Sequence, residues 1–368
     1  MEKDARRTIW IVTIAIMSMG LMAIYSASSQ STRVSQSVFY DQLLCAVIGL
    51  AVMFFLSRFD YRKLYDATHI LYLVSIVFLI LVLVMGRHIL GARRWIEIGS
   101  INFQPSEFAK LSLILVLARY FSQLKAGHYF RTHDPIQAAM KEFFIPLFIT
   151  AVPMLLIFKQ PDLGTAIMIF GIFLGLVFVS GTGLKYILSF IVLGVGASPF
   201  LWHLLKPYQK ERLMVFLNPN ADPLGAGYTI IQSKIAIGSG RLFGKGWLAG
   251  TQNQLNLLPE RHTDFIFSVI GEEWGLFGAL LLLFCFYVLI DCALTIAAQT
   301  KDRFGFLIVV GIISILALQV IVNIGMVLGL FPVVGLTLPL VSYGRTSFLT
   351  FTIMIGLLLN LNRKSASL

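Results

Sequence analysis

The sequence predicts an all-α polytopic membrane protein, and three observations lead to this fold class. Hydrophobic residues make up 57% of the 368-residue chain and charged residues 13%, with a mean hydropathy of +0.83. Apolar runs of about 20 residues, enough to cross a bilayer as a helix, recur along the chain. One long polar segment, at about 206–264, interrupts them. A soluble core of this size could not bury so much apolar surface, whereas a bilayer can.

Ten apolar runs are long enough to span a membrane, and we expect each to form a helix. The first follows three basic residues and resembles a signal peptide, but it is longer than a cleavable hydrophobic region and should remain as a span. The eighth is overlong and is expected to open with an interfacial turn. The ten runs are 8–27, 38–56, 66–85, 105–122, 142–158, 163–181, 184–205, 265–297, 304–330 and 335–361.

The polar segment at about 206–264 is expected to be a large loop between the seventh and eighth helices. We treat residues 1–368 as a single integral membrane domain that carries this loop. A chain that can place its residues in lipid but keeps such a segment in water is expected to carry its chemistry there.

The basic residues predict the orientation. With the N-terminus in the cytoplasm, the inside segments carry fourteen Lys and Arg and the short outside connectors five, which is the bias of the positive-inside rule. Both termini are therefore expected in the cytoplasm and the long loop outside. The connectors 91–110 and 159–166 and the turn 342–347 fall on the same outer face, which is the expected working surface.

The net charge of +11 also bears on the ligand. Inside-positive topology accounts for about half of the basic residues. The others lie on the predicted outer face, where cations suit a phosphate-bearing ligand. Nucleic acid is not expected, because no basic helix or aromatic stacking pattern stands clear of the membrane. Cys45, Cys285 and Cys292 lie in apolar runs and are expected to be inert packing residues.

The stretch LPERHTDF at 258–265 holds a dense group of titratable residues. Asp264 comes directly before the eighth span, where partial desolvation would raise its pKa and its basicity. Asp264 could equally cap the helix or form an interfacial ion pair. His262 is a rival base, and Glu260 is a third candidate for a base or metal ligand.

Further charged residues lie near the outer ends of spans. Glu272 and Glu273 lie just inside the eighth span, where acids usually face a cavity or a partner, unless that first turn is solvated. Glu107 and Lys110 have the i, i+3 spacing of an ordinary ion pair, but their position also suits a cavity. Asp162 follows a proline at the start of a span, which is typical of a helix N-cap.

No established catalytic or metal motif accompanies these residues. The run GSGRLFGKG at 238–246 lacks Walker spacing and a preceding strand, so it indicates a flexible polar loop rather than a nucleotide site. No GxSxG, HExxH, CxxC or EF-hand pattern appears. The residues alone predict an outer-face acid/base site suited to a phosphorylated, lipidic ligand, and they leave an enzyme and a transporter open.

The same segments resemble the SEDS family (shape, elongation, division and sporulation). The motifs run in the family's order between about residues 90 and 350, and those of the long loop are more similar to the rod-shape (RodA) subgroup than to the division subgroup. They read GARRWIEIG, FQPSEFAK, QPDLGTA, YQKERLMVFLNP, DPLGAGY, IQSKIAIGSG, GKGWLAGTQNQL, LPERHTDFIF, EEWGLFG, NIGMV and GLTLPLVSYG.

The resemblance implies a peptidoglycan glycosyltransferase, a lipid II polymerase that makes β-1,4 glycan strands at the outer face of the bacterial cytoplasmic membrane during cell elongation. It also implies a divalent cation, Mg or Mn, as cofactor and a class B penicillin-binding protein transpeptidase as partner. Asp264 matches the family's catalytic aspartate, and Glu107 and Lys110 match its cavity pair.

The implied reaction inverts the anomeric centre, so it needs one general base and positive charge at the leaving pyrophosphate. Asp264 is the expected base. No metal ligand is assigned from the sequence. The residues expected to bind the substrate are Glu107, Lys110, Arg212, Lys234, Lys245, Glu260, His262 and Ser342.

Two positions depart from the family pattern. Arg345 stands where the family usually has the second glycine of SYGG, and Arg241 where it often has the last glycine of GSGG. An arginine beside the cavity could add a pyrophosphate contact or reshape the wall. The alternative functions are a lipid II flippase, which would need polar sites near the midplane, and a non-catalytic scaffold for the penicillin-binding protein.

Overall fold

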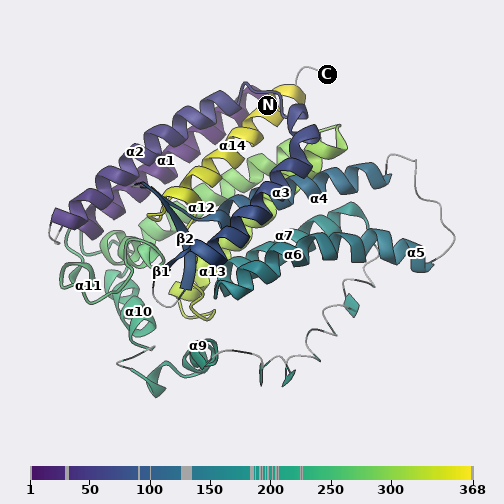
Figure 1. Ribbon diagram of the computed structural model, residues 1–368. Coiled ribbons are helices and arrows are strands. Elements are labelled where there is room, and N and C mark those ends of the chain that lie inside the picture. Colours follow the sequence, from purple (N-terminus) through teal and green to yellow (C-terminus); the bar gives the residue numbers. More distant parts are fainter. Residues whose placement is uncertain are drawn as a thin grey trace.

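The protein is a bundle of long helices with a small β-sheet and short helices at one end (Figure 1). The computed structural model describes residues 2–29, 33–89, 92–99, 101–125, 135–182, isolated positions between 183 and 206, 207–223, 225 and 227–365. The long helices are α1 (Glu2–Ser28), α2 (Arg33–Leu56), α3 (Arg62–Met85), α4 (Pro105–Lys125), α6 (Ile145–Lys159), α7 (Leu163–Ser180), α12 (Ile266–Gln299), α13 (Arg303–Val327) and α14 (Arg345–Ser365).

Seven helices within the described ranges are long and apolar enough to cross a membrane, so the predicted polytopic helical fold is confirmed. Helices α4 and α14 also coincide with predicted spans. The predicted span 184–205 lies largely outside the described residues, so the count of ten stays a prediction. The seven spans are Asp4–Ser28, Ser37–Leu56, Arg62–Met85, Met140–Lys159, Leu163–Ser180, Ile266–Gln299 and Arg303–Val327.

The end of the bundle away from the termini carries the short elements (Figure 1), and we call it the loop end. Strand β2 pairs antiparallel with β1 on one side and β3 on the other. The short elements at this end are β1 (Arg87–Ile89), β2 (Ala92–Ile98), β3 (Ile101–Phe103), α9 (Pro207–Leu217), η2 (Pro219–Ala221), α10 (Tyr228–Gly240) and α11 (Thr251–Gln254). Two further short helices, α5 (Pro135–Ala139) and η1 (Met140–Phe144), come directly before α6, and α5 lies on the opposite side of the bundle from the sheet (Figure 1).

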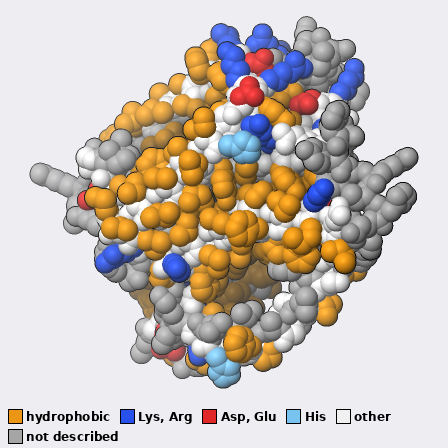
Figure 2. All heavy atoms as spheres, turned by 45° about the vertical axis from the view of Figure 1, so that its right-hand side comes forward, with side chains coloured by type: hydrophobic (Ala, Val, Ile, Leu, Met, Phe, Trp, Pro, Cys, Tyr) orange, Lys and Arg blue, Asp and Glu red, His pale blue; other side chains and the backbone are white. Residues whose placement is uncertain are grey.

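The opposite end, the terminal end, carries both termini (Figure 1). Figure 2 shows a broad belt of hydrophobic side chains across one face of the molecule, with Lys and Arg side chains gathered above it at the terminal end. An apolar belt with charge at its edge is the surface expected of a protein that crosses a bilayer.

At the loop end, one prediction from hydropathy is wrong and one element was not predicted. The tenth run was expected to be helical from residue 335, but α14 begins at Arg345. The positive φ angles of Gly335 (71°) and Leu340 (62°) interrupt the helix, as does the proline between them at 339. The sheet at 87–103 was not expected either, because strands of three to seven residues leave little periodicity to detect.

Helix α12 is overlong as predicted, but its irregular position lies inside the helix rather than in an opening turn. Over 34 residues it contains one non-helical position, Gly275, with φ 65° and ψ −159°. Only glycine adopts this region without strain. The segment before Gly275 holds Glu272 and Glu273, and the segment after it continues as a long apolar helix.

Candidate active site

A cavity of about 550 Å³ lies at the loop end, where α12 begins. Its charged groups are three arginines and two carboxylates, contributed by four separate parts of the chain. Its lining consists of Arg94, Trp95, Asn102, Gln104, Arg212, Thr229, Pro259, Glu260, Thr263, Asp264, Phe265, Val333, Gly335, Thr337, Tyr343, Gly344, Arg345 and Thr346.

Asp264 lies at the wall of this cavity, two residues before α12. The N-cap residue of α12 is Phe265, so Asp264 does not cap that helix. Burial raises the pKa of the Asp264 carboxyl to about 7, and repulsion from Glu260 adds to the increase. The positive charges of Arg94 and Arg212 act in the opposite direction on this pKa. A base with a pKa near 7 is well matched to proton transfer at neutral pH.

The backbone at Asp264 is held from α13 and from the segment before α14. Asn323 donates from Nδ2 to the carbonyl oxygens of Asp264 (2.9 Å) and Leu336 (2.6 Å). Ser342 donates from Oγ to the carbonyl oxygen of Thr263 and accepts a hydrogen bond from the backbone N–H of Leu338 (2.7 Å). Ser342, predicted to bind substrate, therefore ties the segment before α14 to the loop before α12.

Arg94 was not among the predicted substrate-binding residues, yet it lies on β2 at the cavity wall. Its Nη1 is 3.8 Å from Oδ1 of Asp162, and Asp162 caps α7 as predicted by accepting from the backbone N–H of Thr165 (3.2 Å). A Cβ added to Gly335 would lie 3.4 Å from Asp264 Oδ2 and 3.9 Å from Arg94 Nη1. The carboxylate and the guanidinium therefore border the same small space beside Gly335.

Two predicted substrate-binding residues, Arg212 and Glu260, do line the cavity. Arg212 reaches in from α9, and its Nη1 donates to the carbonyl oxygen of Val333 (3.1 Å). Glu260 adopts a positive φ of 47°, and its carboxylate accepts from Thr263 Oγ1 (3.2 Å). Arg345 also lines the cavity, and its guanidinium forms an ion pair with Asp41 on α2.

The predicted pair Glu107 and Lys110 lies behind the cavity wall. Their side chains are almost fully buried and form an ion pair of 2.8 Å. Lys110 Nζ also donates to Gln319 Oε1 (3.1 Å), and Gln319 Nε2 donates to the carbonyl oxygen of the lining residue Thr337 (2.9 Å). The pair therefore reaches the cavity through Gln319, a residue that sequence reasoning did not select.

The other predicted substrate-binding residues are not part of the cavity lining. Lys245 forms an ion pair of 2.7 Å with Glu272. Lys234 lies on α10, where its side chain approaches the turn at Gly329. The ring of His262 meets Tyr343 edge to face at 5.9 Å, and burial lowers the pKa of this imidazole.

The buried acids of α12 face partners rather than water. Glu272 accepts from Lys245 and from Thr251 Oγ1 (3.1 Å), and Glu273 accepts from Asn253 Nδ2 (3.2 Å) and from Ser26. These contacts attach the loop before α12 to the helix itself. The sequence left open a cavity, a partner or a solvated first turn for these acids, and the partner is correct.

Metal ligands are sparse in the described part of the chain, which contains no group of three or more His, Cys, Asp and Glu side chains placed to hold an ion. Within the cavity, Glu260 and Asp264 are the carboxylates.

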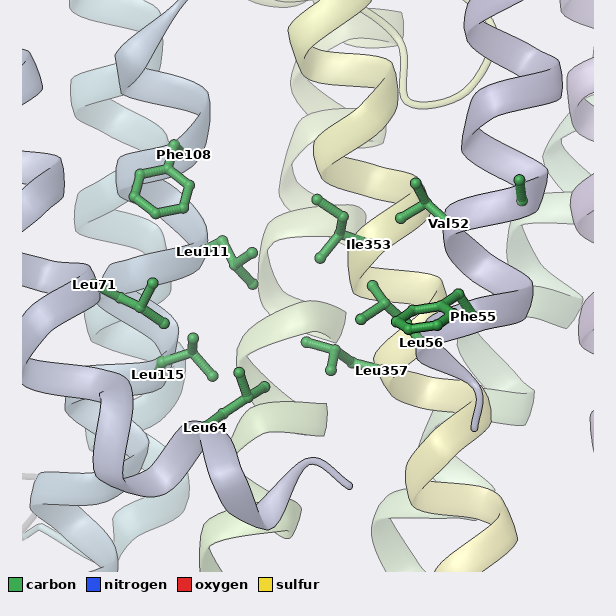
Figure 3. A pocket seen from close by; sticks show the side chains of 11 residues that line it. Val52, Phe55, Leu56, Leu64, Leu71, Phe108, Leu111, Leu115, Ile353 and Leu357 are labelled. Atoms are coloured by element: carbon green, nitrogen blue, oxygen red, sulfur yellow. The ribbon is translucent and has the colours of Figure 1, made fainter. Parts of the chain in front are cut away.

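A second pocket, of about 620 Å³, lies among α2, α3, α4 and α14. Figure 3 shows side chains of α3 and α4 facing those of α2 and α14 across it. Every lining residue is apolar, and none carries a hydrogen-bonding side chain. They are Ala51, Val52, Phe55, Leu56, Leu64, Leu71, Phe108, Leu111, Leu115, Ile353 and Leu357.

Comparisons with known proteins agree with the motifs. The model of the cell cycle protein family FtsW/RodA/SpoVE matches residues 6–367. The chain is 40% identical over 356 residues to the peptidoglycan glycosyltransferase MrdB of Escherichia coli K12, covering 96% of this chain and 92% of that protein.

Two solved structures are also similar. One, described as structural coordination of polymerization and crosslinking by a peptidoglycan synthase complex, has a TM-score of 0.80 and 32% identity and covers 97% of both chains. The other is an aspartate-to-alanine variant of the rod shape determining protein RodA of Thermus thermophilus, with a TM-score of 0.71 and 31% identity, covering 97% of this chain and 96% of that one. The chain therefore belongs to the FtsW/RodA/SpoVE family, the SEDS family that its motifs resemble, and to the RodA subgroup within it.

Proposed function

We propose that this protein is a peptidoglycan glycosyltransferase that polymerises lipid II into β-1,4 glycan strands during cell elongation. The observation that carries the proposal is the Asp264 carboxyl, with a pKa of about 7, in a cavity that also holds three arginines. The likeness to the E. coli peptidoglycan glycosyltransferase supports the same chemistry.

The reaction requires one proton transfer and one displacement. The carboxylate of Asp264 takes the proton of the acceptor's 4-hydroxyl as its oxygen attacks the anomeric carbon of the donor sugar. The bond from that carbon to the pyrophosphate breaks, and the bond pair leaves with the undecaprenyl pyrophosphate. Attack opposite the leaving group converts the α-linkage of the donor into the β-linkage of the product.

Positive charge at the leaving pyrophosphate is the second requirement. Arg94 and Arg212 supply it in this proposal, because both guanidiniums lie at the cavity wall and both act on the charge of Asp264. Guanidinium groups bind phosphate oxygens through two parallel hydrogen bonds. Lys110 and Lys245 take no direct part in this step, because their ammonium groups pair with Glu107 and Glu272.

A divalent cation, Mg or Mn, fits the donor set. Such ions usually take one or two protein carboxylates and complete their shell with substrate phosphates and water. We assign Glu260 as that carboxylate, since it lines the cavity. When bound, the cation would neutralise charge on the pyrophosphate. EDTA is expected to abolish or strongly reduce polymerisation, and added Mg²⁺ to restore it.

The apolar pocket among α2, α3, α4 and α14 suits the lipid part of the substrate. A prenyl chain has no polar group to satisfy, and neither has the lining of this pocket. Such a substrate would enter from the bilayer while its sugars and phosphates lie at the loop end.

We place the protein in the bacterial cytoplasmic membrane with both termini in the cytoplasm and the loop end outside. The gathering of Lys and Arg at the terminal end supports this orientation (Figure 2). A class B penicillin-binding protein is the proposed partner, and the likeness to a peptidoglycan synthase complex that coordinates polymerization and crosslinking supports it.

The test is polymerisation by purified protein supplied with lipid II and Mg²⁺, read as glycan ladders on a gel. Asp264→Asn is expected to lower the rate by at least about 100-fold, the usual contribution of a positioned base. The control is Asp291→Asn, which changes an exposed aspartate of α12 outside the cavity. Full polymerisation by Asp264→Asn would show that Asp264 is not the general base.

A further inference from the structure

Arg345 is the first residue of α14 and lies at the rim of the cavity. Its guanidinium pairs with Asp41 of α2, and the two side chains are 25% and 35% exposed. The pair therefore lies between the cavity and the helix that forms one wall of the apolar pocket. A charged group in this position is open to an incoming ligand.

The turn before Arg345 is fastened without this ion pair. Gln42 donates from Nε2 to the carbonyl oxygen of Ser342 (3.5 Å) and accepts at Oε1 from the backbone N–H of Gly344 (3.4 Å). The backbone N–H of Tyr343 donates to the carbonyl oxygen of His262 (2.9 Å). Backbone and amide contacts therefore hold the turn in addition to the Arg345–Asp41 ion pair.

The ion pair itself is easily exchanged. Pairs between partly exposed side chains contribute little to stability, because water competes for both charges. A phosphate carries more negative charge than Asp41 and accepts two parallel hydrogen bonds from one guanidinium. A bound phosphate can therefore replace Asp41 as the partner of Arg345.

The apolar pocket lies along the same two helices, α2 and α14, that carry Asp41 and Arg345. Ile353 lines the pocket and follows Arg345 by eight residues on α14, a rise of about 12 Å. Val52 lines it from α2 and follows Asp41 by eleven residues, a rise of about 16 Å. A molecule with an apolar tail in the pocket and a phosphate at its head would present the phosphate near Arg345.

We propose that Arg345 is a phosphate-binding residue at the rim of the cavity, and that Asp41 is its exchangeable counter-ion. The ligand is the phosphate or pyrophosphate headgroup of a lipid-linked substrate, which takes the place of Asp41 when it binds. The choice of ligand rests on the proposed function, whereas the binding site rests on the geometry of α2 and α14.

The test measures binding of inorganic pyrophosphate to the purified full-length protein in detergent by calorimetry. Arg345→Gly is expected to weaken binding about tenfold or more, in line with the loss of a charge-assisted contact. Arg345→Lys keeps the charge but cannot donate two parallel hydrogen bonds, so it is expected to weaken pyrophosphate binding severalfold. Asp41→Asn is expected to tighten binding, because it removes the competing anion.

Arg241→Gly is the matched control. Arg241 is likewise an arginine of the loop end, but it does not line the cavity, and its φ of 49° suits glycine. This variant is expected to bind pyrophosphate like the unmodified protein. Thermal unfolding of each variant shows that it is folded, and Arg345→Gln replaces Arg345→Gly if the latter is not.

Three results would overturn the proposal. Unchanged pyrophosphate binding by Arg345→Gly would show that Arg345 does not bind phosphate. Equal weakening of pyrophosphate binding by Arg345→Gly and by Asp41→Asn would show that the ion pair only supports the structure. Equal dependence on Arg345 for a peptide that ends in a free carboxylate, which carries no phosphate, shows that the site does not select phosphate.

The binding result is independent of catalysis. Asp264→Asn is expected to fail in polymerisation and still to bind pyrophosphate with dependence on Arg345. If Asp264→Asn polymerises lipid II normally, the proposed base is wrong. The phosphate site at Arg345 is still tested separately, by calorimetric measurement of pyrophosphate binding.

Discussion

The pKa of Asp264 follows from burial and from four charged neighbours. Burial, Glu260 and Asp162 raise the pKa of its carboxyl, while Arg94 and Arg212 limit the increase. Loss of the arginines would raise this pKa further, and exposure to water would lower it. The pKa of about 7 reflects the balance between these opposing influences.

The pH dependence of the reaction tests this balance. A general base must be ionised, so the rate is expected to rise with pH through about 7, the pKa of Asp264. Arg94→Gln removes a charge that favours the carboxylate, so the rising limb is expected to move to higher pH. The measurement is kcat/KM for lipid II between pH 5.5 and 9. An unmoved limb in this variant would show that Arg94 does not act on the base.

Gly335 separates the base from Arg94. A methyl group there would lie within 4 Å of Asp264 Oδ2 and of Arg94 Nη1, and the φ of 71° disfavours any side chain. Gly335→Ala is expected to lower polymerisation by at least about tenfold and to cost ~1 kcal/mol or more of stability. Glycan ladders and thermal unfolding measure the two effects, and full activity would show that a substrate group does not enter this space.

At the scale of elements, the break in α12 is stabilised by the loop that precedes it. The backbone N–H groups of Lys245 and Gly246 donate to the carbonyl oxygens of Glu272 and Glu273, each at 3.0 Å. The N–H of Leu276 donates to the carbonyl oxygen of Arg241 (2.9 Å). The loop therefore satisfies backbone groups that the helix leaves unpaired at Gly275.

Gly275→Ala tests this attachment. The φ of 65° and ψ of −159° suit only glycine, and an added Cβ would lie 2.3 Å from the backbone nitrogen of Gly244. The variant is expected to lose ~1–3 kcal/mol of stability, measured by thermal unfolding in detergent.

Gly238→Ala provides the matched comparison. This glycine lies in helix α10, with no atom within 4 Å of an added Cβ. Here alanine is expected to be neutral or to stabilise the helix by ~0.5–1 kcal/mol. Equal effects of the two substitutions would contradict the role of the break.

The cavity and a cluster of basic side chains lie at opposite ends of the molecule. The cavity, the sheet and the helices α9, α10 and α11 occupy the loop end, and Figure 2 shows Lys and Arg side chains of one face gathered at the terminal end (Figures 1 and 2). The apolar belt between them keeps the two ends in different aqueous compartments once a bilayer surrounds it.

Cysteine labelling tests the orientation of the molecule. The three native cysteines are buried and should give little background. Asn220→Cys at the loop end and Lys301→Cys at the terminal end introduce exposed thiols. In intact spheroplasts, a membrane-impermeant maleimide is expected to label the first variant at once and the second only after permeabilisation. The reverse pattern would invert the proposed orientation.

Hydropathy and local motifs were sufficient for the membrane class, for most helix positions and for the place of Asp264 directly before the long helix, because each depends on residues close together in the chain. The N-cap at Asp162 was also predictable, whereas the break at Gly275 was not, since the sequence indicated only an opening turn. The sheet at 87–103 was not, because strands this short carry too little pattern.

The sequence did not indicate which residues line the cavity. Arg94, Arg212, Asp264 and Arg345 are far apart in sequence, and helix packing alone decides that they line one space. The same packing directs Lys110 and Lys245 toward other carboxylates, although their type and position suited a phosphate. Composition and periodicity specify which segments enter the bilayer, since transfer free energy adds up residue by residue. A charged side chain finds its partner through the close fit of distant helices, and no local pattern encodes that fit.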